Sequence, residues 1–125
     1  VATDGSAHSA AAADTAAAVA SQCRLPVTVV SATKPSHSAE RKAEARAEVD
    51  TLTATLTAAG LTCEGVVMEG RPDEVVIEVA ASAKADLIVV GSHGRTGLSR
   101  LILGSISERI MGQAQCPVMV ARAPA

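Results

Sequence analysis

Short runs of β-branched and aliphatic residues alternate with longer helical segments along the chain, and this alternation restricts the fold more than any other feature. Strands are predicted at residues 1–3, 26–32, 61–70, 85–91 and 116–121. Helical patterns fill the intervals, and no two predicted strands follow one another directly. This order predicts an α/β fold with a parallel sheet, right-handed crossovers and helices on both faces.

The predicted core is aliphatic, because Phe, Tyr and Trp are absent from all 125 residues. Val, Leu, Ile, Met and many Ala must fill it, which favours thin, closely packed layers. A chain of this length buries roughly two-thirds of its unfolded surface, so we expect one domain over residues 1–125. The lack of aromatic side chains also argues against nucleic acid as a partner, because single-stranded bases normally stack on such side chains.

Charge and cysteine content indicate the class of protein and its redox compartment. With 48% hydrophobic residues, 19% charged residues and a net charge of −2, the composition is typical of a soluble globular protein. Cys23, Cys63 and Cys116 are far apart and form no C-x-x-C pair, so a reducing, cytoplasmic compartment fits better than a disulfide framework or a zinc site. No apolar run reaches the roughly 18 residues that cross a bilayer, so we expect no membrane association.

The loops after the first and fourth predicted strands are the candidate ligand site. In parallel α/β sheets, ligands bind beyond the carboxyl ends of the strands, where the strand order reverses. The first loop begins at Asp4, and the second contains several glycines and ends at Gly104-Ser105. Glycines let backbone amides approach an anion, and a helix start adds unpaired N–H groups and partial positive charge. An alternative is that Ser105 only caps its helix, in a capping box with Glu108.

The glycine spacing matches neither of the two common nucleotide fingerprints. The P-loop pattern is absent, and G-x-G-x-x-G does not follow the first strand. The loop instead resembles the universal stress protein family, whose nucleotide-binding members carry G-x-x-G, nine residues and then G-[ST]. Here Gly91 and Gly94 begin the pattern, residues 95–103 form the spacer, and Gly104 and Ser105 complete it. ATDGS, EGRP and CPVMVAR extend the resemblance over nearly the whole chain.

The resemblance implies a five-stranded parallel sheet in the order 3-2-1-4-5, ATP binding in the nucleotide-binding branch, and a homodimer. Six positions would form the nucleotide site. Asp4 would border the nucleotide, Ala32 would line the adenine, and Gly91, Gly94, Gly104 and Ser105 would hold the phosphates and ribose.

Asp4 raises the question of a metal ion. A carboxylate beside a triphosphate is repelled unless a cation bridges them, so Mg²⁺ or Mn²⁺ is expected if Asp4 faces the phosphates. The alternative is that Asp4 forms an Asx-type turn that leads into the first helix.

Catalysis has weaker support than binding. His93, Arg95 and Arg100 lie in or near the loop, but the sequence has no paired carboxylates, no activated nucleophile and no Walker lysine. We therefore expect an ATP-binding regulatory protein with slow hydrolysis at most. A dimeric interaction scaffold of the same fold without nucleotide binding and a weak ATPase remain the alternatives.

The last predicted strand is an apolar edge at Val118, Met119 and Val120. A bare edge of this kind risks aggregation, and antiparallel pairing with a second copy would cover it. The alternative, a local covering loop, has only residues 122–125 available.

Overall fold

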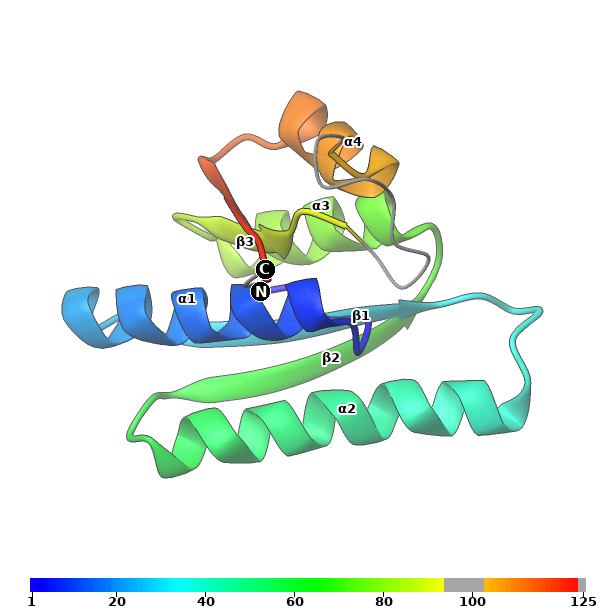
Figure 1. Ribbon diagram of the computed structural model, residues 1–125, viewed down its shortest axis with the longest axis horizontal. Coiled ribbons are helices and arrows are strands. Elements are labelled where there is room, and N and C mark those ends of the chain that lie inside the picture. The colour runs from blue at the N-terminus through cyan, green and yellow to red at the C-terminus, as the bar shows by residue number, and fades with distance from the viewer. Residues whose placement is uncertain (94–102, 124–125) are drawn as a thin grey trace.

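The computed structural model describes residues 1–93 and 103–123 (Figure 1), so the predicted site residue Gly94 lies outside the described part. The elements follow one another as α1 (Ala7–Cys23), β1 (Val27–Thr33), α2 (Ala39–Ala58), β2 (Cys63–Glu69), α3 (Pro72–Ala83), β3 (Ile88–Gly91), α4 (Ser105–Gln113) and β4 (Val118–Ala121). Helices and strands alternate as the sequence predicts, and the α/β class is confirmed.

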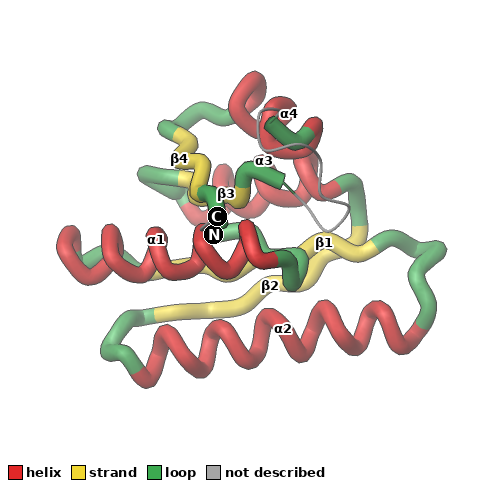
Figure 2. Tube along the Cα trace, viewed as in Figure 1, coloured by secondary structure: helices red, strands yellow, loops and turns green. Residues whose placement is uncertain are grey.

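The strands form two parallel pairs. β1 pairs with β2 from Val27 opposite Cys63 onward, and β3 pairs with β4 from Ile88 opposite Val118 onward. Figure 2 shows β1 and β2 side by side with α2 running along them. Within the described residues, four strands therefore stand where five were predicted.

Residues 1–3, predicted as the first strand, form an isolated parallel bridge between Ala2 and Val30. The backbone of residues 1–3 forms hydrogen bonds with both strand pairs. The Thr3 N–H donates to the Val30 carbonyl at 2.9 Å, and the Ala2 N–H donates to the Val89 carbonyl at 3.2 Å. The order 3-2-1-4-5 stays a prediction.

Side chains of β1 point alternately to two helical layers, as the period of a strand requires. Val27 and Val29 cluster with Val49 of α2, whereas the adjacent Val30 clusters with Val76 of α3. In β3, Val89 packs against α1 while its neighbours pack toward α3 and α4. Helices therefore cover both faces, with α1 and α2 on one and α3 and α4 on the other.

Helix α1 lies close to β3 because the side chains between them are small. Ala12 is fully buried, and Ala16 packs with it against Val89. The helix begins after Ser6, whose hydroxyl accepts the Ser9 N–H at 3.2 Å as an N-cap. No helix of the described residues is long and apolar enough to cross a membrane.

A carboxylate that is ion-paired with an arginine is buried at the start of α3. Pro72 occupies the first turn, and the Arg71 guanidinium donates two hydrogen bonds of 2.8 Å to the carboxylate of Asp73, which is fully buried. These bonds lower the pKa of Asp73 below its usual range, and the charge of Arg109 on α4 adds to the effect. The pair thereby ties the residue before α3 to the first turn of that helix.

We expect Asp73→Asn to destabilise the fold and to weaken its acid sensitivity. A carboxyl whose pKa is lowered on folding stabilises the fold above its unfolded pKa of about 4, and this contribution is lost as the pH falls through the lower folded pKa. Urea unfolding at neutral pH and at about pH 3 measures both effects.

The matched control is Asp50→Asn, because Asp50 pairs with Arg46 on the solvent-exposed face of α2. This control should change the free energy of unfolding little, since solvent screens exposed ion pairs and they stabilise a fold weakly. Equal pH dependence in Asp73→Asn and the unmodified protein would contradict the assignment.

Candidate functional site

A cavity of about 150 Å³ opens at the carboxyl ends of β1 and β3. Its walls are mostly aliphatic and include Ala32, Val90 and Ile110. Its polar groups come from four separate segments of the chain. They are Thr3, Asp4, Ser9, His93 and Ser107. A pocket with apolar walls and a few convergent polar groups is the usual form of a small-molecule site.

Asp4 lies in the wall of this cavity and also shapes the turn into α1. Its Oδ1 accepts the Ser6 N–H at 2.9 Å, which is the Asx-type turn expected as the alternative to metal binding. Among residues 1–93 and 103–123, no group of three or more His, Cys, Asp or Glu side chains is placed to hold a metal ion. Asp4 therefore supplies a single carboxylate to the site.

Gly91 also lines the cavity, and its lack of a side chain is needed for packing. A Cβ at this position would lie 2.7 Å from the backbone carbonyl carbon of His8, closer than real Cβ contacts. The Gly91 carbonyl accepts the Ser107 hydroxyl at 2.7 Å. The end of β3 is thus in direct contact with the first turn of α1 and is bonded to α4.

Gly104 and Ser105 lie at the start of α4, beside the cavity rather than in its wall. The Gly104 N–H donates to the Ser92 carbonyl at 2.7 Å, and a Cβ on Gly104 would lie 3.1 Å from the same oxygen. The N-cap is Gly104, which has no side chain to cap the helix, so the alternative of a capping box between Ser105 and Glu108 is wrong. Ser105 is the first helical residue and is exposed.

Sequence reasoning missed the hydroxyl groups at this site. Ser107 is buried, and the Thr3 and Ser9 hydroxyls lie 3.3 Å apart. A signal for Ser107 was present, since it lies between Ile106 and Ile110 on a short amphipathic helix. No comparable signal marked Thr3, because its contact with Ser9 depends on how the chain turns at residues 4–6.

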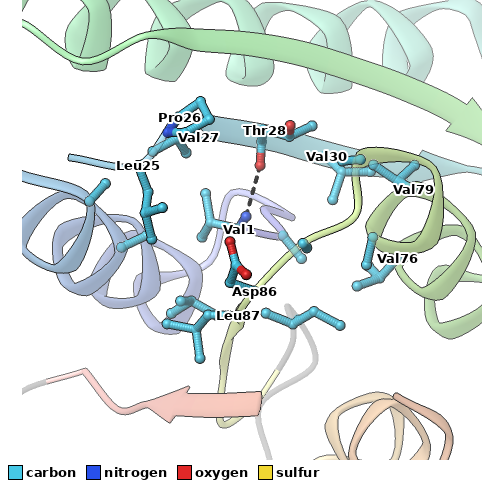
Figure 3. Close-up of a pocket in the computed structure, with 18 of the residues that line it drawn as sticks. Val1, Leu25, Pro26, Val27, Thr28, Val30, Val76, Val79, Asp86 and Leu87 are labelled. Atoms are coloured by element: carbon cyan, nitrogen blue, oxygen red, sulfur yellow. Dashed lines mark hydrogen bonds between the residues drawn. The ribbon is translucent and has the colours of Figure 1, made fainter. Parts of the chain in front are cut away.

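A second cavity, shown in Figure 3, lies at the opposite, amino ends of β1 and β3. It is lined mainly by aliphatic side chains, including Leu25, Val79 and Leu87. The Val1 nitrogen donates to the Thr28 carbonyl there at 2.8 Å. Among the described residues that line this cavity, none is a glycine or the first residue of a helix.

A family model described as the universal stress protein family matches residues 1–122. The chain belongs to this family. One similar relative is universal stress protein MJ0531 of Methanocaldococcus jannaschii, which is 49% identical over 57 residues, or 46% of this chain and 34% of the relative. Alignments with the first two curated relatives span between 34% and 57% of their lengths.

Solved structures of universal stress proteins resemble the whole chain. One in complex with cAMP is 27% identical, has a TM-score of 0.80, and is matched over 99% of this chain and 94% of the other. One from Archaeoglobus fulgidus in complex with dAMP is 20% identical with a TM-score of 0.77, over 96% and 93% of the two chains. The second likeness establishes the shared fold alone.

We expect Gly91→Ala to destabilise this universal stress protein by roughly 1–3 kcal/mol, the usual cost of overpacking. The added methyl group meets the backbone of His8, which cannot rotate away as a side chain would. The matched control is Gly112→Ala in α4, where a Cβ has nothing within 4 Å. That variant should be neutral or stabilised by up to about 1 kcal/mol. Thermal unfolding of both variants checks this, and an unchanged melting temperature in Gly91→Ala would contradict it.

Proposed function

We propose that this chain is an adenine-nucleotide-binding regulatory protein, with ATP as its ligand and slow hydrolysis at most. The observation that carries the proposal is the meeting of Asp4, Ala32 and Gly91 around one cavity beside the start of α4. These residues come from three distant segments of the chain, and the sequence predicts all three as nucleotide contacts. The structural relative that holds cAMP adds support, since it is similar over nearly the entire chain.

The aliphatic cavity would hold the adenine ring. A complete small-molecule pocket usually has a volume of roughly 300–1,000 Å³, whereas this cavity has about 150 Å³. The volume therefore suits the base alone, with ribose and phosphates lying outside it. Ala32 would contact the ring, and its small side chain leaves the room that a flat ring needs.

The phosphates would lie against the first turn of α4. An α-helix leaves its first amides without partners in the helix, and its dipole favours an anion there. The N-cap of α4, Gly104, has no side chain that could occupy these amides. Because the Gly104 N–H already donates to Ser92, we assign phosphate binding to the amides that follow it, with Gly91, Gly94 and Ser105 completing the contacts.

Asp4 would contact the phosphates through a divalent cation. Mg²⁺ is commonly held by one or two carboxylates together with substrate phosphates, and Asp4 provides one carboxylate in the cavity wall. Mg²⁺ or Mn²⁺ would offset the repulsion between this carboxylate and the triphosphate.

We also propose that residues 1–3 are the central strand of one five-stranded sheet. In the predicted order 3-2-1-4-5, residues 1–3 count as the first strand, so the sheet would run β2, β1, residues 1–3, β3 and β4. Their hydrogen bonds to Val30 and Val89 support this order. The outer strand would then be β4, where Met119 is 38% exposed. A second copy would pair with that edge through Val118, Met119 and Val120, and light scattering on the pure protein would report the dimer mass.

We expect Ala32→Leu to weaken ATP binding at least tenfold, which corresponds to about 1.4 kcal/mol. The larger side chain fills the cavity proposed for adenine, while the fold keeps its stability because the new atoms enter open space. Calorimetric titration with ATP and Mg²⁺ measures the change, and repeating it with EDTA tests the role of the cation.

The matched control is Ala54→Leu, the same substitution on an exposed position of α2. It should leave binding unchanged. Absence of heat from the unmodified protein at millimolar ATP would overturn the proposed function and favour an interaction scaffold. Equal affinity in Ala32→Leu would place the ligand elsewhere.

A further inference from the structure

Three hydroxyl groups of the described residues line the cavity at the carboxyl ends of the strands. Thr3 precedes the turn into α1, Ser9 lies in the first turn of that helix, and Ser107 lies in the first turn of α4. Ser9 and Ser107 are each 5% exposed. A hydroxyl has one proton to donate and two lone pairs that accept. The way the protein uses these three protons therefore decides what a ligand meets in the cavity.

The proton of Ser107 is directed to the end of β3. The Ser107 hydroxyl donates to the Gly91 carbonyl at 2.7 Å, and a carbonyl can only accept. The direction of this bond is therefore fixed. Turning the proton toward a ligand would break the bond to Gly91, so Ser107 offers a ligand its lone pairs.

The proton of Ser9 is directed to the backbone at the start of α1. The Ser9 hydroxyl donates to the Ser6 carbonyl at 2.9 Å. This bond is shorter than the contact of 3.3 Å between the Ser9 and Thr3 hydroxyls. Because Ser9 gives its only proton to Ser6, Thr3 is the donor in the contact between the two hydroxyls.

Thr3 completes a chain of hydrogen bonds that all run in one direction. The Thr3 oxygen accepts the Gly5 N–H at 3.4 Å, the Thr3 proton goes to Ser9, and the Ser9 proton goes to Ser6. Each contact in the chain holds one proton between one donor and one acceptor. The Thr3 and Ser9 oxygens each keep one lone pair that no hydrogen bond among the described residues uses. A ligand would meet these two oxygens as acceptors.

The other polar side chains in the described part of the wall are those of Asp4 and His93. The Asp4 carboxylate adds oxygen acceptors, one of which accepts the Ser6 N–H. An imidazole ring can both donate and accept. A donor from His93 would suit the purine nitrogens N3 and N7, which adenine and hypoxanthine share. The contrast between these two bases would therefore depend on the hydroxyls.

We infer that Thr3, Ser9 and Ser107 determine the base specificity of the site, because they present only hydrogen-bond acceptors to the edge of a 6-aminopurine. The amino group of adenine donates, whereas the 6-oxo group of hypoxanthine or guanine is itself an acceptor. An oxo group at this position would place two acceptors together with no proton between them. This inference rests on the proposed function, since it requires the base to lie in this cavity.

The matched pair of ligands is ATP and ITP, which differ only at the purine 6-position and in the proton on N1. We expect ATP to bind at least tenfold more tightly than ITP, since a buried polar group left unsatisfied costs about this factor or more. Calorimetric titration of the unmodified protein with each nucleotide and Mg²⁺ measures the ratio. Equal affinities, or tighter binding of ITP, would overturn the inference while the proposed function stands.

Two variants test the residues themselves. Ser107→Ala and Thr3→Val each remove one acceptor oxygen from the wall with little change in volume. We expect each variant to lower the ratio of ATP affinity to ITP affinity roughly two- to tenfold, because ATP loses a hydrogen bond and ITP loses a repulsive contact. Thermal unfolding shows whether each variant is folded. An unchanged ratio in the folded variants would contradict the assignment.

The matched control for Thr3→Val is Thr55→Val on α2. The Thr55 hydroxyl also bonds within the protein, donating to the Thr51 carbonyl at 2.9 Å, but Thr55 lies outside the wall of this cavity. The affinities for ATP and ITP should both be unchanged in this variant.

Adenosine and inosine separate the inference from the proposed function, because they carry the same two bases without phosphates. If ATP gives no heat but adenosine binds more tightly than inosine, the proposed function fails and the inference stands. If none of the four compounds binds at millimolar concentration, both are overturned.

Discussion

The backbone hydrogen bonds of residues 1–3 join the two halves of the molecule. Thr3 donates to Val30 in one strand pair and Ala2 donates to Val89 in the other, at 2.9 and 3.2 Å. Without these bonds, β1–β2 and β3–β4 would be separate two-stranded ribbons, which are marginal in water. The same segment continues into Asp4 and the capped start of α1, so it also brings the first loop to the cavity.

The fold class could be predicted because each element has a strong local pattern. Aliphatic runs marked β1, β2, β3 and β4, and helical patterns marked the intervals between them. The boundaries were less predictable. The strand predicted at 85–91 is β3, Ile88–Gly91, and residues 1–3 form only a bridge. Both outcomes depend on which distant backbone lies alongside, and no local pattern carries that information.

The candidate site stays a prediction, and its contacts could not be predicted from the sequence. The glycine pattern placed it at the carboxyl ends of the strands, where Gly91 lines a cavity. Gly91 and Gly104 also meet packing needs, against His8 and Ser92 respectively. The amphipathic pattern of α4 could have indicated that Ser107 is buried, but not its hydrogen bond, because the acceptor is 16 residues away in sequence. Polar residues of this kind look ordinary until the fold shows what they bond to.

The central claim is that an adenine nucleotide binds where α1, β3 and α4 meet. The most direct test is to titrate ¹⁵N-labelled protein with ATP and Mg²⁺ and to follow the backbone amide signals. We expect the largest shifts at Thr3, Ala32 and Ser107 around the carboxyl-end cavity, with little change at Leu25 and Leu87 around the aliphatic cavity at the opposite end. Shifts confined to the opposite end, or no shifts at millimolar ATP, would contradict it.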